Sequence, residues 1–195
     1  SVSLGRAIGW RGHDFRYHYL LGLSHLETGQ YEAAEGSLRR SLELHPHYAL
    51  SLQLLGRTLY YLKREDEAIQ ILKQAAKLDP QEENNYALLA LNYRRQGDHG
   101  RAIEAWIQAL GLQPNNVRFI NSLGVEYHSA GALDQAIAVL EQGVQGQPEN
   151  GKIQGHLGEV YLAAGALDKA EKSLLKAIEY MPEKTSWRSS IVQVY

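Results

Sequence analysis

The chain has 195 residues, of which 44% are hydrophobic and 22% charged, and its formal net charge is -2. This composition is typical of a folded protein. No apolar run approaches the roughly 20 residues of a membrane-spanning helix, so we expect no membrane insertion. The absence of cysteine excludes disulfides, thiol catalysis and cysteine-bound zinc. It leaves the compartment open between a cytoplasmic location, which we prefer, and a periplasmic one.

All five prolines recur at one spacing of 34 residues, at positions 46, 80, 114, 148 and 182. On the same period, counted from Phe15, the seventh place is always leucine and the twentieth is always alanine. The eighth place is glycine or alanine, and the twenty-fourth is leucine or tryptophan. Small residues let two helices approach closely, and large ones fill the space that remains. The spacing therefore predicts a repeated unit of two packed helices.

The last unit, residues 151–184, shows the pattern of both helices. Leu157, Val160 and Tyr161 recur at the spacing of one helix face, and Gly165 follows them, where a left-handed residue can end a helix. A second apolar stripe begins at Leu167. The unit is a helical hairpin with one apolar side, which it can bury only against neighbouring units.

This pattern resembles the tetratricopeptide repeat (TPR), a helix–turn–helix unit of 34 residues with small residues at places 8, 20 and 27 and a late proline. The resemblance spans five repeats, at 15–48, 49–82, 83–116, 117–150 and 151–184. It implies an all-α fold, a right-handed superhelical solenoid of helix-turn-helix repeats.

The two ends are expected to be incomplete repeats. Residues 1–14 match the second helix of an incomplete preceding repeat. Residues 185–195 match a partial first helix of a following repeat or a cap, with Trp187, Ile191 and Val194 on its inner face. Such ends predict a piece of a longer protein.

First helices are expected near 16–28, 50–62, 84–96, 118–130 and 152–164, and second helices near 31–44, 65–78, 99–112, 133–146 and 167–180. Four residues depart from the pattern: His18, His25 and Ser41 at places 4, 11 and 27 of repeat one, and Lys63. Ser41 stands where the other repeats have alanine or glycine, which predicts that repeat one is the weakest. Lys63 replaces the glycine that ends the other first helices, and a left-handed lysine there costs roughly 1 kcal/mol.

The sequence contains no arrangement that predicts catalysis. Among eight histidines, no pair stands at i and i+4 with a carboxylate, as a helical zinc site requires. No nucleophile has a base placed to activate it, and the pattern provides no strand for a phosphate-binding loop to follow. We therefore expect no enzyme activity, no metal and no cofactor.

In TPR proteins the first helices line a concave groove, and the resemblance implies that places 2, 5, 9, 12 and 13 face it. Here these places hold six basic and two acidic residues, a balance of +4 against -2 for the whole chain. A concave wall focuses such a field and favours an acidic partner. We expect a protein or peptide to bind through an acidic or C-terminal segment, at Arg57, Tyr60, Tyr61, Arg94, Arg95, Arg118 and Asn121.

Other partners agree less well with the sequence. TPR domains that clamp the C-terminal carboxylate of a chaperone use five polar residues. At the corresponding places of the central repeats, only Arg118 keeps the charge that the clamp requires. Nucleic acid is not expected, because basic residues do not run continuously along the surface. The chain can also be the TPR segment of a larger enzyme or of a bacterial polysaccharide or pilus export complex. Self-association stays open, since exposed repeat ends present apolar stripes.

Overall fold

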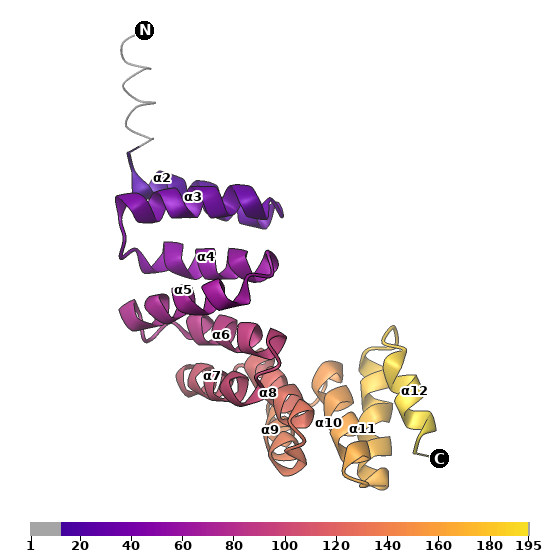
Figure 1. Cartoon of the computed structure of the whole chain (residues 1–195). Helices are drawn as coiled ribbons and strands as arrows, with labels where there is room; N and C mark the ends of the chain where they lie inside the picture. The colour runs from indigo at the N-terminus through magenta and orange to yellow at the C-terminus, as the bar shows by residue number, and fades with distance from the viewer. Residues whose placement is uncertain (1–12, 195) are drawn as a thin grey trace. The chain divides into compact units, whose positions relative to one another are not determined.

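The computed structural model describes residues 13–194, and this part of the chain forms eleven α-helices and no strand (Figure 1). The first helices of the repeats are α2 (Phe15–Glu27), α4 (Ala49–Tyr61), α6 (Glu83–Arg95), α8 (Val117–Ser129) and α10 (Gly151–Ala163). The second helices are α3 (Tyr31–Leu44), α5 (Glu65–Leu78), α7 (His99–Leu112), α9 (Leu133–Gly146) and α11 (Leu167–Tyr180). A short helix, α12 (Ser186–Val192), follows them. The predicted all-α fold is confirmed, and the predicted helix in residues 1–14 lies almost wholly outside the described residues.

The second helices have the predicted bounds, whereas the first helices begin and end one residue earlier than predicted. The cause of the shift is visible at three N-termini. The side chain of Asp14 accepts a hydrogen bond from the backbone N–H of Arg16, and Asn116 and Asn150 cap α8 and α10 in the same manner. A capping residue lies just outside the helix, so the helix begins at the residue that follows it.

The chain divides into two compact units, residues 1–98 and 99–195, and each is described by itself. The first unit contains α2 to α6, and the second contains α7 to α12, so the division falls inside the third repeat. Within each unit the first helices contact one another in succession. Helix α4 contacts both α2 and α6, and α10 contacts both α8 and α12. Each unit therefore has one surface that is built from first helices.

The turns inside the hairpins use a left-handed residue. Four of them have glycine, at Gly29, Gly97, Gly131 and Gly165, with φ between 74° and 77°. The remaining turn has Lys63 with φ 58°, and no other non-glycine residue in the described part of the chain has a positive φ. Lys63 thus keeps the left-handed conformation of the glycines that it replaces, and its side chain destabilises the turn by roughly 1 kcal/mol.

Small and large residues face each other inside the hairpins, as the spacing predicted. A Cβ on Gly56 would lie 2.4 Å from Cγ of Leu72, so no side chain fits there while the leucine keeps its position. The glycines at the same place in repeats one, four and five meet the leucine at place 24 in the same way. The alanines at place 20 have no exposed surface. These contacts set how closely the two helices of a hairpin approach.

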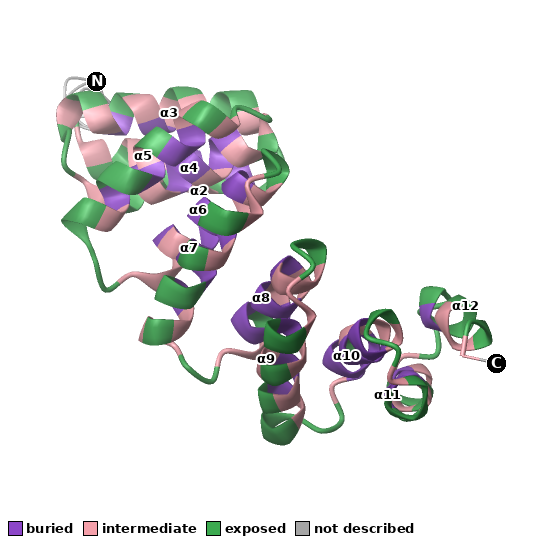
Figure 2. Ribbon diagram, turned by 60° about the horizontal axis from the view of Figure 1, so that its bottom comes forward, coloured by how far each residue is buried: buried purple, intermediate pink, exposed green. Residues whose placement is uncertain are grey.

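Burial is greatest on the first helices in the interior of each unit (Figure 2). Helix α10 is covered by α8, α9, α11 and α12, and it buries eight of its thirteen residues. Helix α11 buries four and leaves its outer face in solvent. At the end of the second unit, Trp187 of α12 is 1% exposed and packs with Leu174 and Ala177 of α11. The side chains of Ile191 and Val194 pack against the same cluster.

Ser41, the polar residue that interrupts the pattern of repeat one, has hydrogen-bond partners for its buried hydroxyl. Ser41 has no exposed surface, and its hydroxyl donates a hydrogen bond of 2.8 Å to the carbonyl of Phe15. A second bond of 2.8 Å joins it to the hydroxyl of Ser51, which is also buried. Because hydrogen-bonded hydroxyls avoid the cost of burying an unpaired polar group, the serine pair replaces the usual apolar contact without leaving an open donor.

Candidate functional site: the first-helix surfaces

In the first unit, Arg95 ties α6 to α4. Its guanidinium lies 3.6 Å from the centroid of the Tyr60 ring and donates hydrogen bonds to the carbonyl of Tyr60 and, at 3.2 Å, to Oε1 of Glu65. The Tyr60 carbonyl belongs to the last turn of α4, where a cation also interacts favourably with the helix dipole. Arg95 is therefore engaged inside the chain and connects consecutive repeats.

Two other arginines of the predicted site have no such partners. Arg57 on α4 is half-buried, and its Nε is enclosed without a hydrogen-bond acceptor in the described residues. Arg94 on α6 is also half-buried, and its side chain forms no hydrogen bond or ion pair with another described residue. A buried N–H without an acceptor costs roughly 1–3 kcal/mol, which applies to the Nε of Arg57.

Tyr61 lies against the second helix of repeat one. Its ring stacks on that of Tyr31, with centroids 4.8 Å apart and planes inclined by 10°. It also meets the ring of Tyr60 edge-on at 5.6 Å. Since 47% of Tyr61 is still exposed, the pair of tyrosines offers an aromatic edge beside Arg57 and Arg95 on the same unit.

In the second unit, Arg118 and Asn121 both lie on α8, but their surroundings differ. Arg118 is exposed. Asn121 is 8% exposed, and its Oδ1 accepts a hydrogen bond of 2.7 Å from Nδ1 of His156 on α10. Burial lowers the pKa of His156 to about 4, and the neighbouring charge of Lys152 acts in the same direction. The imidazole is therefore neutral near pH 7, and the bond joins two uncharged groups across neighbouring repeats.

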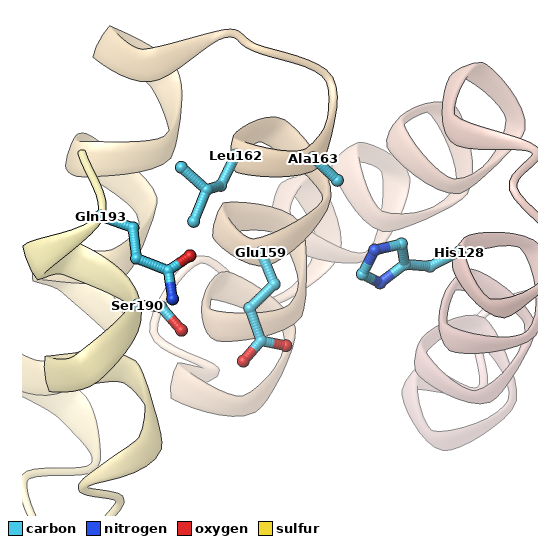
Figure 3. A pocket seen from close by; sticks show the side chains of 6 residues that line it. All are labelled: His128, Glu159, Leu162, Ala163, Ser190 and Gln193. Carbon is cyan, nitrogen blue, oxygen red and sulfur yellow. The ribbon is translucent and has the colours of Figure 1, made fainter.

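The first-helix surface of the second unit contains a pocket of about 510 Å³ (Figure 3). It is lined by His128, Glu159, Leu162, Ala163, Ser190 and Gln193. In Figure 3 the side chains of Glu159 and Gln193 point into the same space, which His128 faces from the other side. Burial raises the pKa of Glu159, against the opposing effects of Lys184 and a hydrogen bond from Trp187. The pocket thus presents one carboxyl group, an imidazole, an amide and a hydroxyl.

The structure groups the predicted site residues by unit. Five of the seven, from Arg57 to Arg95, lie on α4 and α6 of the first unit, and two lie on α8 of the second. Within the first unit it brings Tyr60 into contact with Arg95 and with Tyr61.

None of the six pocket residues is among the seven predicted site residues. His128, Glu159, Leu162 and Ala163 stand at the predicted groove-facing places 9, 12 and 13, whereas Ser190 and Gln193 were not predicted. Gln193 stands at place 9 of the last partial repeat, so extending the groove positions to that repeat would have identified it.

Two other properties concern the described residues alone. Residues 13–194 contain no group of three His, Cys, Asp or Glu side chains that is arranged to hold a metal ion. None of the helices in the same range is long and apolar enough to span a bilayer.

Family models described as tetratricopeptide repeat match residues 19–83, 88–150 and 127–190. The chain belongs to the tetratricopeptide repeat family. TPR folds generally mediate protein–protein interaction, and TPR scaffold proteins are generally not enzymes. No curated protein sequence matches this TPR chain.

Solved TPR structures share the architecture. A crystal structure of MamA is 25% identical, with a TM-score of 0.78 over 85% of this chain and 97% of that one. The structure of YrrB, a TPR protein described as having an unusual peptide-binding site, is 18% identical, with a TM-score of 0.80 over 95% of this chain and 96% of that one. A thermophilic TPR protein of Thermus thermophilus is 25% identical, with a TM-score of 0.65 over 92% and 98%. These similarities confirm the solenoid fold.

Proposed function

We propose that this TPR chain is a non-enzymatic scaffold whose first-helix surface binds an acidic or C-terminal peptide segment of a protein partner. The observation that supports this most is the state of Arg57 and Arg94. Both are half-buried on adjacent first helices, and neither side chain has a hydrogen-bond or ion-pair partner among the described residues. Partly buried cations without counter-ions favour an anionic ligand, because the ligand supplies the missing charge and acceptor.

The chemistry of arginine is suited to the carboxylate of an acidic or C-terminal peptide segment. A guanidinium can donate two parallel hydrogen bonds to one carboxylate, and the enclosed Nε of Arg57 is one of the donors that needs an acceptor. The rings of Tyr60 and Tyr61 lie in the same unit and offer apolar area to neighbouring side chains of the peptide. Arg95 has a different part in this proposal: it fixes the position of Tyr60. In the second unit, Arg118 and Asn121 of α8 are proposed to contact the partner through that unit's own first-helix surface.

The test is affinity capture from the lysate of the source organism, read by mass spectrometry. Wild type is compared with Arg94→Glu and with a control in which Lys73 and Lys77, both exposed on α5, are replaced by glutamate. Arg94 is chosen over Arg95, because reversing Arg95 would also break its bonds to Tyr60 and Glu65. We expect a partner with an acidic segment that Arg94→Glu loses and the control keeps. Equal retention by all three proteins would refute the proposed site.

A further inference from the structure

A second cationic surface lies on the other side of the second unit, where α9, α10 and α11 meet. Three lysines of α11, Lys169, Lys172 and Lys176, are spaced at i, i+3 and i+7, so they share one helix face. They line a hollow of about 410 Å³ whose floor includes Val144 and Leu157. We call this surface the lysine hollow. None of its residues belongs to the site proposed above.

The single carboxylate of the lysine hollow is engaged by a neutral donor. Glu141 of α9 accepts a hydrogen bond from the hydroxyl of Tyr161 on α10. Burial, together with Glu141, raises the pKa of Tyr161, so its hydroxyl stays protonated and keeps donating near pH 7. The ammonium of Lys169 lies 5.2 Å from the centroid of the same ring. Lys172 and Lys176 form no hydrogen bond or ion pair with another described residue. The hollow therefore has an excess of positive charge.

In the first unit, the second helices α3 and α5 occupy the positions that α9 and α11 have around the lysine hollow, and there the charges are paired. There Arg39 and Arg64 each pair with both Glu35 and Glu67. Two of these four ion pairs, Arg39–Glu67 and Arg64–Glu35, join α3 to α5 and to the residue before it. Glu67 and Lys169 occupy the same place in their repeats, as do Arg39 and Glu141. In the second unit no ion pair is formed between these two places. The excess charge of the lysine hollow is thus a property of repeats four and five and not of every repeat.

We propose that the lysine hollow is a second docking surface, which binds an acidic peptide segment of a partner independently of the first-helix site. Lys172 and Lys176 are spaced at i and i+4 of α11, and this spacing places the Cβ atoms of two helical residues about 6 Å apart. Carboxylates two residues apart in an extended peptide are separated by about 7 Å, so both lysines can be paired at once. The apolar floor at Val144 and Leu157 accommodates the aliphatic parts of such a segment.

A carbodiimide coupling experiment tests this proposal, because it joins a carboxylate to a lysine amine and leaves arginine unmodified. The probe is a short blocked peptide rich in glutamate, and its glutamine counterpart is the control peptide. Coupled lysines are identified by mass spectrometry. We expect the peptide on Lys172 and Lys176 in preference to Lys73 and Lys77 of α5, even though both α5 lysines are exposed and Lys176 is half-buried. Added salt is expected to reduce the preference, since exposed charges are screened.

Variants complete the test. Replacing Lys172 and Lys176 with glutamine is expected to weaken binding of the fluorescent glutamate peptide to the lysine hollow by about three- to tenfold, as two partly exposed ion pairs are lost. Arg94→Glu is expected to leave the coupling at Lys172 unchanged, which separates this proposal from the first-helix site. Uniform coupling of all exposed lysines would overturn the proposal, and so would coupling confined to Lys152 on α10. Equal binding of a phosphate polymer and the peptide would overturn the assignment to a peptide.

Discussion

The docking of α12 depends on a missing side chain. A Cβ on Gly155 would lie 2.0 Å from Cε2 and 2.2 Å from Cζ2 of Trp187. Ordinary van der Waals contact begins near 3.4 Å, so the Gly155→Ala substitution requires the rigid indole to move by more than an ångström. Trp187 is buried against α11 and cannot move without losing that packing. We expect Gly155→Ala to destabilise the docked α12 by roughly 1–3 kcal/mol, the usual cost of overpacking.

The effect should be local, because a repeat array is stabilised mainly by contacts between neighbours. Hydrogen exchange of residues 186–192 is expected to accelerate, and the fluorescence of Trp187 to shift towards that of exposed tryptophan, while α8 and α9 keep their protection. Gly36→Ala is the matched control: a Cβ there meets nothing within 4 Å, so alanine is expected to stabilise α3 by about 0.5–1 kcal/mol. Unchanged protection of residues 186–192 in Gly155→Ala would refute the reasoning.

Three further predictions follow from single contacts. Lys63→Gly is expected to raise the free energy of unfolding by at most about 0.5 kcal/mol in urea titrations, because the entropy cost of glycine offsets much of the relieved left-handed strain. Ser41→Ala is expected to destabilise the chain by about 1–3 kcal/mol, because the buried hydroxyl of Ser51 loses its partner. The double substitution Ser41→Ala with Ser51→Ala is expected to destabilise the chain by less than the sum of the two single substitutions, because it leaves no buried hydroxyl without its partner. The pKa of His156 is lowered from 6.5 to about 4, so the unfolded chain binds a proton at this residue before the folded chain does as the pH falls. The free energy of unfolding should therefore drop by about 3 kcal/mol between pH 6.5 and pH 4, as measured by thermal or urea unfolding. His156→Gln should show a much smaller drop.

The repeat register predicted the contacts that recur and missed those that do not. The pairing of Gly56 with Leu72 and the left-handed Lys63 both follow from a position within the repeat, and both are observed. The partners of Arg95 could not be predicted, because Tyr60 and Glu65 lie 35 and 30 residues earlier and the contact depends on side-chain geometry. A pattern of places identifies which helix face a residue occupies but not whether a neighbouring repeat has already neutralised its charge.

The same limit applies to the second unit. Lysines at places 19, 22 and 26 of a second helix read from sequence as an ordinary solvated face. Only the positions of Glu141 and Tyr161 show that the one carboxylate lining the hollow already accepts a hydrogen bond from a neutral donor. The contact between Gly155 and Trp187 could not be predicted either, because the repeat pattern does not require glycine at place 5 and only the structure shows the indole packed against it.

The most direct test of the proposed peptide site is an NMR titration of the isotope-labelled chain with the glutamate-rich peptide. The Nε–H signals of Arg57 and Arg94 report on the two guanidinium groups that lack partners in the described residues. The first-helix proposal predicts that both signals shift and saturate together, that backbone signals of α4 and α6 follow, and that the glutamine peptide leaves them in place. Shifts confined to α11, with the two arginine signals unmoved, would contradict it and leave the lysine hollow as the peptide site.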